Sequence, residues 1–360
     1  MKRRDFIKKA SVGAAGAVAI TGAPAVISAT PKVRWRMATS WPKILDTIYG
    51  GAVTVSERLK EMSDGNFTIR PYAAGELVGG LEVFDAVSQG TVEAGHTASY
   101  YYIGKHPAFA FDTAVPFGLN YRQQNAWLHG GGGLELMRKL FADFNIINFP
   151  AGNTGVQMGG WFRKEVNTVA DMQGLKMRIP GLGGKVMNRL GVSVQVIPGG
   201  EIYPALERGA IDATEWVGPY DDEKMGFNKV AKYYYSPGWW EPAPTLSVYA
   251  NDKAYAALPK TYQEMLRTAC AEANQQMMVD YDSKNPAALD RLVASGVELR
   301  TFSDEILEAC EREANALLAE NAAADARFKE IHDNWAPFRD SIRKWHGQAE
   351  ASYARYTSKG

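Results

Sequence analysis

Apolar side chains recur at two different intervals in the first part of the chain. Every second residue is apolar in Lys32–Thr39, which predicts a β-strand with one buried face. Between Ile48 and Met62, apolar residues lie three or four positions apart, which predicts the apolar face of a helix. Phe67–Tyr72 predicts a second strand. A helix between two strands is typical of an α/β fold.

Two short stretches of the chain resemble each other. They are VFDAVSQGTVEAGH at Val83–His96 and IYPALERGAIDATE at Ile202–Glu215, with identical or similar residues at one constant offset. Each predicts a short helix, a glycine (Gly90 or Gly209) that ends it in a left-handed turn, and a strand. A repeated unit favours two lobes that are built alike, with a ligand cleft between them. The alternative is chance similarity between stretches rich in Ala and Gly.

The later pattern predicts the extent of the two lobes. A second lobe is expected to begin near Pro150, and Pro237–Glu241 is expected to cross back to the first. The second lobe includes two strands and an intervening helix: Leu175–Ile179, Gly183–Leu190 and Val194–Ile197. We therefore expect lobe I to comprise residues 30–150 and about 237–300, and lobe II residues 151–236.

Residues 301–360 predict a helical carboxyl-terminal segment. Apolar residues from Ile306 to Leu318 fall on one helix face, and aromatic residues from Phe328 to Trp345 continue an amphipathic pattern. Such a tail can pack on its own core or on a partner subunit, and the sequence leaves both open.

The amino terminus predicts an export signal over residues 1–29. Arg3 and Arg4 precede an apolar run rich in Ala and Gly from Ala10, and small residues before Ala29 suit cleavage there. This is the pattern of a twin-arginine signal peptide. A membrane anchor is the weaker alternative, because the run is too short and too rich in Gly to span a bilayer. We expect an exported protein.

The charge balance argues against two classes of partner. The formal net charge of the whole chain is zero. The predicted signal holds a surplus of four positive charges, from Lys2, Arg3, Arg4, Lys8 and Lys9 against Asp5. The remainder is therefore near −4, which disfavours binding to nucleic acid or to an anionic membrane surface.

Cys270 and Cys310 are the only cysteines, and both lie in predicted helices. An oxidising compartment permits a disulfide, but we expect two separate buried thiols. Neither cysteine has a histidine nearby in sequence, so neither a cysteine nucleophile nor a zinc site is indicated.

Candidate ligand-binding residues lie at predicted segment ends in the second lobe or at its exit. They are Gln157, Arg178, Glu215, Trp216 and Glu241. Arg178 stands in a strand that otherwise appears buried, and a buried arginine requires an anion. That anion is either an internal Asp or Glu or a ligand carboxylate held by two parallel N–H···O bonds.

The two glutamates allow more than one interpretation. Glu215 and Glu241 could perform acid–base chemistry, as in a glycosidase, or could bind a cation with help from the Gln157 amide and a backbone carbonyl. Each could also be a solvated or salt-bridged acid. The adjacent Asp221–Glu223 cluster is most simply a solvated loop or a helix start.

One tyrosine hydroxyl among Tyr100–Tyr102 is expected to reach a ligand, because buried tyrosines seek a partner. Tyr101 is the candidate. A secreted enzyme that processes carbohydrates or acids with Glu215 and Glu241 remains the competing hypothesis, although no His, Ser or Cys constellation supports it. A sensor that passes its signal to a membrane receptor is a third.

Longer motifs resemble a known family. The stretches are WRMATSWP from Trp35, AGEL at Ala74–Leu77, LKMR at Leu175–Arg178, AGNTGVQMGGWFR at Ala151–Arg163, DATEWVGPYDDEK at Asp212–Lys224 and YYYSPGWWE at Tyr233–Glu241. The chain after the signal resembles the substrate-binding proteins of TRAP transporters. The last three motifs resemble those of the subgroup that binds 2-oxo acids such as pyruvate.

The resemblance implies a two-lobed periplasmic binding protein of type II-like fold, with mixed sheets flanked by helices and no enzymatic activity. It implies that the protein delivers a small 2-oxo acid to membrane permease subunits. It also implies a homodimer formed by a swapped carboxyl-terminal helix.

For the site, the resemblance implies that Arg178 holds the ligand carboxylate. Gln157, Glu215, the Trp216 carbonyl and Glu241 would surround the ligand and a cation, Na⁺ or alternatively Ca²⁺. How these contacts divide between cation and ligand is left open. Trp41 departs from the phenylalanine expected in the subgroup, which implies a tighter pocket or a shifted preference if it lines the cleft.

Overall fold

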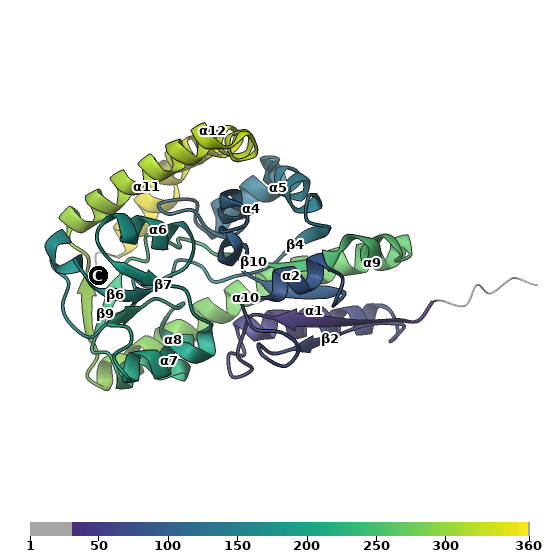
Figure 1. Cartoon of the computed structure of the whole chain (residues 1–360), viewed down its shortest axis with the longest axis horizontal. Coiled ribbons are helices and arrows are strands. Elements are labelled where there is room, and N and C mark those ends of the chain that lie inside the picture. The colour runs from purple at the N-terminus through teal and green to yellow at the C-terminus, as the bar shows by residue number, and fades with distance from the viewer. Residues whose placement is uncertain (1–30, 359–360) are drawn as a thin grey trace, which may run out of the picture. The chain divides into compact units, whose positions relative to one another are not determined.

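A computed structural model describes residues 31–358 of the chain. The export signal predicted for residues 1–29 lies outside these described residues. Two β-sheets flanked by helices form the framework (Figure 1). The α/β class with mixed sheets, predicted from the sequence, is confirmed.

The first sheet has five strands in the order β2-β1-β3-β10-β4. They are β1 (Val33–Thr39), β2 (Phe67–Tyr72), β3 (Ala94–Thr97), β4 (Ile146–Asn153) and β10 (Thr245–Asn251). β1 runs parallel to β2 and β3, whereas β10 runs antiparallel to β3 and β4. The first predicted strand, helix and strand correspond to β1, α1 (Ile48–Met62) and β2.

The second sheet has six strands in the order β11-β9-β5-β8-β6-β7. They are β5 (Trp161–Phe162), β6 (Lys176–Arg178), β7 (Ser193–Gln195), β8 (Ala213–Thr214), β9 (Tyr233–Ser236) and β11 (Glu298–Thr301). β6 runs parallel to β7 and β8, and β5 runs antiparallel to β8 and β9. Without β11, this order and these directions repeat those of the first sheet, so the two sheets are built alike.

The repeated sequence unit occupies the same position in both sheets. It forms α2 (Val83–Ser88) with β3, and α7 (Gly199–Glu207) with β8. The glycines after the helices, Gly90 and Gly209, have φ angles of 73° and 69°, a left-handed conformation that glycine adopts without strain. The predicted helix, glycine turn and strand are confirmed in both copies, and each strand lies between a parallel and an antiparallel neighbour.

Both faces of each sheet are covered. Apolar residues of α1 and of α10 (Lys260–Ala294) form one cluster with the first sheet, and those of α2 and α5 (Gly133–Ala142) pack on its other face. α6 and α11 cover one face of the second sheet, and α7 covers the other. The remaining helices are α3 (Ala110–Thr113), α4 (Tyr121–Gly130), α5 (Gly133–Ala142), α6 (Gly181–Arg189), α8 (Pro219–Met225), α9 (Asp252–Ala256), α10 (Lys260–Ala294), α11 (Asp304–Ala324), α12 (Ala326–Gln348) and α13 (Glu350–Thr357).

The long helix α10 packs against both sheets. Its Leu266 belongs to the apolar cluster of the first sheet, whereas Tyr281 and Leu292 belong to that of the second. After α10, the chain enters β11, which pairs with β9 in the second sheet. The range 237–300, expected to lie in lobe I, therefore contains residues that pair in the second sheet.

The carboxyl-terminal segment is helical, as predicted. Phe328 and Trp335 of α12 are buried against Phe111, whereas Trp345 is 64% exposed. The expectation of two separate buried thiols is confirmed, because Cys270 and Cys310 are free and buried. Within residues 31–358, no helix combines the length and apolarity needed to cross a membrane.

Candidate functional site

The candidate site lies where the two repeated strands end. β3 leads into the 3-10 helix η2 (Ser99–Tyr102), and β8 leads into Glu215 and Trp216. β6, the parallel neighbour of β8, ends at Arg178. Ligands of open α/β sheets bind beyond the carboxyl ends of the strands. The repeat therefore supplies one wall of a site from each sheet.

A small cavity lies between these strand ends. Its volume is about 10 Å³, roughly the room for one water molecule. Its lining residues are Trp41, Ile48, Tyr100, Tyr101, Thr154, Gln157, Arg178, Trp216, Val217, Pro244 and Leu246. All but Tyr101 are buried, so the side chains close around very little space.

Arg178 is the central charged residue of the lining. It is 1% exposed and forms an ion pair with Glu215, which is fully buried. Its Nε donates to the Ile197 carbonyl at 3.2 Å. The guanidinium carbon lies 5.3 Å from the centre of the Trp216 ring and 6.0 Å from that of Tyr101. Aromatic faces and one carboxylate thus hold the guanidinium in place.

The ion pair sets the charge state of both partners. Burial acts against the charged form of Arg178, yet the adjacent Glu215 carboxylate raises the pKa of the guanidinium. Burial also raises the pKa of Glu215, and the attraction of Arg178 opposes that shift. The two groups are therefore most stable as a charged pair.

Glu241 adds a second buried carboxyl group. It is 3% exposed, and the Tyr100 hydroxyl donates to its Oε2 at 3.5 Å. Burial and the nearby Glu215 carboxylate raise the pKa of Glu241 well above its usual range. Two acids beside one guanidinium leave one excess negative charge when all three are ionised. A proton or a bound cation would compensate that charge.

Four buried polar atoms of the site have no hydrogen-bond partner among residues 31–358. They are Nη2 of Arg178, Oε2 of Glu215, Oε1 of Gln157 and Nε1 of Trp216. Native proteins satisfy most buried polar groups. Such a concentration of unpartnered donors and acceptors around one cavity indicates that a ligand completes the site.

The chemistry of these atoms fits an organic acid together with a hard cation. A free guanidinium nitrogen suits a carboxylate, and carboxylate and amide oxygens suit Na⁺ or Ca²⁺. In the described part of the chain, no three His, Cys, Asp or Glu residues are grouped so that they could hold a metal ion. A cation here would therefore also need oxygens from an amide, the backbone or the ligand.

A comparison with protein families decides the class of this protein. Residues 37–325 match the family model of bacterial extracellular solute-binding proteins, family 7, called DctP. The chain belongs to the DctP family. These proteins are the solute-binding components of TRAP transporters, which confirms the resemblance seen in the sequence motifs. They are receptors and not enzymes, so the hypothesis of an enzyme using Glu215 and Glu241 is not supported.

Individual DctP relatives are similar over nearly their whole length. A monocarboxylate 2-oxoacid-binding periplasmic protein of Nostoc sp. is 56% identical, covering 99% of each chain. A TRAP solute-binding protein of Bordetella bronchiseptica is 50% identical, with a TM-score of 0.90 over 91% of this chain and 97% of that one. Its crystal contains a dimer of mixed occupancy, with copurified calcium and picolinate in one site.

A third relative is a TRAP solute-binding protein of Pseudoalteromonas atlantica. It is 43% identical, with a TM-score of 0.87 over 90% of this chain and 99% of that one, and it was crystallised with sodium and pyruvate. The Bordetella and Pseudoalteromonas structures thus each contain a cation together with a small acid.

The structure brings the sequence-predicted candidates of this DctP protein together. Gln157, Arg178, Trp216 and Tyr101 line the cavity, and Glu215 and Glu241 contact residues of that lining. Tyr100, one of the three tyrosines considered, also lines the cavity. The residues that the sequence did not single out are mainly apolar: Ile48, Val217, Pro244 and Leu246, with Thr154. Their signal in the sequence was that of ordinary core residues, which is why they were missed.

The expectation of a solvated acidic cluster at Asp221–Glu223 is wrong for two of its residues. Asp221 and Asp222 are buried in the first turn of α8, so the helix-start interpretation holds and solvation does not. Asp221 accepts hydrogen bonds from the hydroxyls of Thr47 and Tyr281. Burial raises its pKa to about 6. Its partners lie far away in sequence, so the local pattern could not reveal them.

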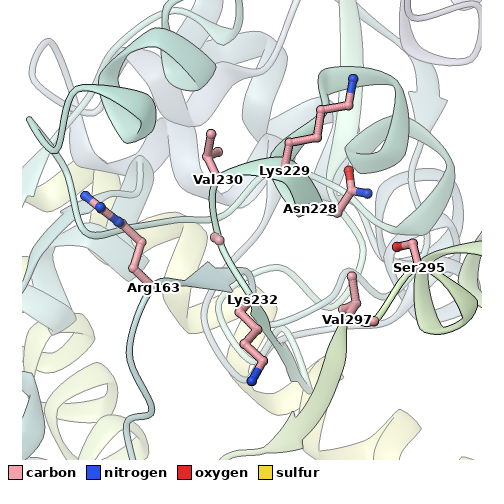
Figure 2. Close-up of a pocket in the computed structure, with 9 residues that line it drawn as sticks. Arg163, Asn228, Lys229, Val230, Lys232, Ser295 and Val297 are labelled. Atoms are coloured by element: carbon pink, nitrogen blue, oxygen red, sulfur yellow. The ribbon is translucent and has the colours of Figure 1, made fainter.

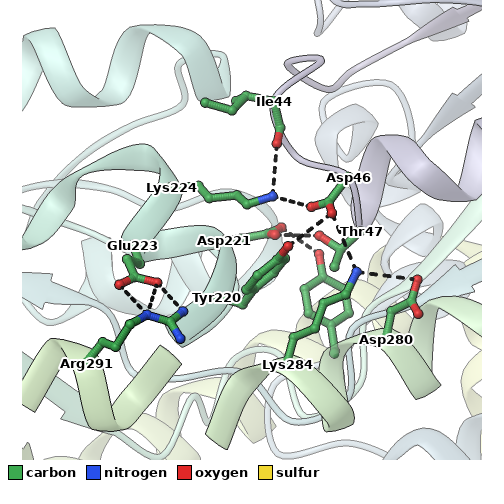
Figure 3. Close-up of polar contacts among 11 residues, drawn as sticks. Ile44, Asp46, Thr47, Tyr220, Asp221, Glu223, Lys224, Asp280, Lys284 and Arg291 are labelled. Carbon is green, nitrogen blue, oxygen red and sulfur yellow. Dashed lines mark hydrogen bonds and ion pairs between the residues drawn. The ribbon is translucent and has the colours of Figure 1, made fainter. Parts of the chain in front are cut away.

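The contacts around Asp221 link α8 to the segment ahead of α1 (Figure 3). Beside Thr47, Asp46 forms ion pairs with Lys224 of α8 and Lys284 of α10. Its carboxylate also accepts from the Tyr220 hydroxyl at 3.0 Å. These bonds join a segment next to the first sheet to a helix next to the second. They therefore hold together the two sides between which the cavity lies.

A second, larger pocket of about 300 Å³ lies where β5 ends and where β9 and β11 begin, and it shares no lining residue with the first cavity. Figure 2 shows the side chains of Arg163, Lys229 and Lys232 pointing in different directions around it. Lys232 is paired with Glu298. Because its charged groups do not converge on one point, this pocket lacks the geometry of a small-anion site.

Proposed function

We propose that this protein captures a small 2-oxo monocarboxylate of the pyruvate type, together with a cation, and delivers it to the membrane permease subunits of a TRAP transporter. The observation that carries the proposal is the unpartnered Nη2 of Arg178, a residue that lines the cavity, together with unpartnered oxygens of Gln157, which also lines it, and of Glu215, the ion-pair partner of Arg178. The Nostoc and Pseudoalteromonas relatives support this ligand class.

Arg178 would hold the ligand carboxylate through its free nitrogen while it remains paired with Glu215. Tyr101 and Gln157 would complete the contacts to the acid. A guanidinium fixed by an internal acid and two rings is already in position, so little conformational entropy is lost when the ligand binds.

Glu215, Glu241, Gln157 and the Trp216 carbonyl would hold the cation, with Na⁺ as the first candidate and Ca²⁺ as the alternative. A bound cation supplies a positive charge that lets the two glutamates remain ionised near an anionic ligand. A 2-oxo acid offers a carboxylate and a neighbouring oxo oxygen. This pair of hard donors suits the same cation.

The magnitude of binding is consistent with transport. At a ceiling of about −1.5 kcal/mol per heavy atom, a pyruvate-sized ligand gains roughly −9 kcal/mol, which corresponds to a Kd near or slightly below the micromolar range. Reaching that value requires every ligand oxygen to be bound, and the set of unpartnered site atoms supports this requirement.

Binding would close lobe II (residues 151–236, with strand β11) on lobe I (residues 30–150 and the rest of about 237–300), because the ligand contacts both and stabilises the closed form. We also infer export by the twin-arginine signal to the periplasm. A homodimer formed through the segment 301–360 is supported by the exposed aromatic side chains of Trp345, Tyr353 and Tyr356.

Isothermal titration calorimetry with pyruvate tests the proposal. We expect micromolar binding in sodium chloride and clearly weaker binding when choline replaces sodium, with calcium as a third condition. A panel of oligosaccharides and amino acids serves as the negative control. Absence of heat with every 2-oxo acid under all three conditions would refute the proposed ligand class, and equal affinity in choline would refute the cation.

A further inference from the structure

Trp41 forms a fixed wall of the cavity. It is 1% exposed and lies among the lining residues. Its indole Nε1 donates to Nδ1 of His96 at 2.8 Å, and Nε2 of His96 lies 3.2 Å from the Ala151 carbonyl. The backbone carbonyl of Trp41 accepts from the Ala74 amide at 3.0 Å. Both the ring and the backbone of this residue are therefore held.

The direction of these bonds follows from the donors available. An indole N–H can only donate, so Nδ1 of His96 must be the acceptor and the ring proton must lie on Nε2, where it donates to Ala151. Burial lowers the pKa of His96 to about 4, so the imidazole is neutral. Because Ala151 belongs to β4 and His96 to β3, the first sheet itself fixes the position of the indole.

The cavity lining has a polar part and an apolar part. Arg178, Gln157, Thr154 and Tyr100 offer hydrogen-bonding groups. The apolar part consists of Trp41, Ile48, Val217, Pro244 and Leu246. A ligand whose carboxylate and oxo oxygen contact the polar side chains leaves its alkyl end to contact the apolar ones, of which Trp41 is the largest.

We propose that Trp41 is the specificity-determining residue that limits the length of the ligand's alkyl end. Its anchored indole favours 2-oxo acids with a short alkyl group over those with longer or branched ones. This inference rests on the proposed function, because it assumes that a 2-oxo acid binds at the cavity.

A neighbouring cavity offers the competing route for a long alkyl group. It has a volume of about 460 Å³, and its lining includes the apolar residues Leu81, Ile103 and Ile179. It shares Tyr100 and Tyr101 with the lining of the candidate site. The Trp41 and Tyr101 rings are 6.2 Å apart, so Tyr101 lies between the proposed wall and this second space.

The test compares affinities for pyruvate and 4-methyl-2-oxopentanoate in the Trp41→Phe variant. Phenylalanine keeps an aromatic wall but removes the fused ring and the N–H group. We expect the ratio of the two affinities to shift toward the longer acid by roughly fourfold for each additional methylene accommodated. The variant Trp35→Phe is the matched control. Trp35 is also buried in the first-sheet core, packs edge-on against Phe67 and does not line the cavity.

A second variant shows whether a loss of stability, rather than a change of the cavity wall, explains the result. Trp41→Phe leaves Nδ1 of His96 buried without its donor, which costs stability. The double variant Trp41→Phe, His96→Leu removes the indole N–H and the imidazole together, so the unpaired acceptor moves from His96 to the Ala151 carbonyl. Both variants should give the same shift in ratio, whatever their unfolding midpoints.

The outcomes separate this inference from the proposed function. If the unsubstituted protein binds no 2-oxo acid, the proposed function fails and the inference fails with it. If it binds pyruvate but Trp41→Phe leaves the ratio unchanged, only the inference is overturned. It is also overturned if Trp35→Phe shifts the ratio equally, or if Ile179→Ala shifts it while Trp41→Phe does not.

Discussion

Arg178 and Glu215 form a buried ion pair between neighbouring strands, yet each keeps one terminal atom without a partner. The register of β6 and β8 pairs Arg178 with Thr214, so Glu215 follows directly at the strand end. Nη1 of the guanidinium meets Oε1 of the carboxylate, whereas Nη2 and Oε2 have no hydrogen-bond partner in the described chain. A purely structural pair would satisfy more of its polar atoms.

The sequence left open two alternatives for the anion beside Arg178, an internal acid or a ligand carboxylate. This half-satisfied pair is compatible with both. The arginine has an internal acid as its partner, and it still lines the cavity with one donor nitrogen unpartnered. Glu215 keeps the guanidinium charged and oriented when no ligand is present. The free nitrogen is then available for a carboxylate without rearrangement of the side chain.

Substitution of Arg178 by alanine should abolish ligand binding. At least two hydrogen bonds to a charged group, each contributing about 1.5–3 kcal/mol, would be lost, so calorimetry should show pyruvate affinity at least about 100-fold weaker. Arg163→Ala, at the pocket without convergent charges, is the matched control. Retained micromolar affinity in Arg178→Ala would remove the central role of this residue.

The same substitution should also lower stability, because Glu215 would become a buried acid without a partner. The expected loss in the free energy of unfolding is about 3–5 kcal/mol. The double variant Arg178→Met, Glu215→Leu should recover most of that loss in urea denaturation while binding stays absent. A double variant that is no more stable than Arg178→Ala would contradict this account of the pair.

Substitution of Glu241 by glutamine should uncouple ligand binding from sodium. The change removes one negative charge and keeps the shape of the side chain. If this carboxylate helps to hold the cation, the difference in pyruvate affinity between sodium and choline chloride should shrink severalfold. Glu223→Gln, at an acid paired with Arg291 on the protein surface, should leave the sodium dependence intact. An undiminished dependence in Glu241→Gln would exclude Glu241 from the cation site.

Local periodicity was sufficient to predict most of the framework. The alternation in β1, the helical spacing in α1 and the glycine turns of the repeated unit depend on neighbours within a few positions. The polar candidates could also be found, because polar side chains at the carboxyl ends of buried strands are conspicuous. Gln157, Arg178 and Trp216 were found in this way.

Contacts between residues far apart in the chain could not be predicted from the sequence pattern. Asp221 is buried because Thr47, 174 positions away, and Tyr281, 60 positions away, donate to it. The sequence could not show whether the partner of Arg178 is an internal acid or a ligand. Glu215 comes next to Arg178 only because β6 and β8 are neighbours in the sheet. Trp41 drew notice only through a family resemblance, since an anchored indole and an ordinary core tryptophan look alike in sequence.

Substitution of Asp46 by asparagine should weaken ligand binding without touching the cavity. Asp46 bonds to Lys224, Lys284 and Tyr220 across the closed arrangement (Figure 3). Its side chain is 53% exposed, so each ion pair contributes only about 0.2–1 kcal/mol. We expect pyruvate affinity to fall roughly two- to tenfold, mainly through faster dissociation in stopped-flow measurements.

Asp280→Asn is the matched control for Asp46, because Asp280 pairs with Lys284 within α10 and not across to the segment ahead of α1. It should leave the dissociation rate near that of the unsubstituted protein. Equal dissociation rates in Asp46→Asn and the unsubstituted protein would show that these bonds do not stabilise the ligand-bound form.

Mild acid should stabilise the folded protein, and Asp221 should account for part of that gain. Burial raises its pKa from an ordinary value of 3.8 to about 6, so between these two values the folded state binds more protons than the unfolded state. The free energy of unfolding therefore falls as pH rises through this window. The unfolding midpoint should accordingly be higher at pH 5 than at pH 7.5.

Asp221→Asn, which cannot ionise, should flatten this dependence of the midpoint on pH, whereas Asp143→Asn, at an exposed acid, should not. A midpoint that falls between pH 7.5 and pH 5 in the unsubstituted protein would mean that the buried carboxyl groups are ionised at lower cost than their burial implies.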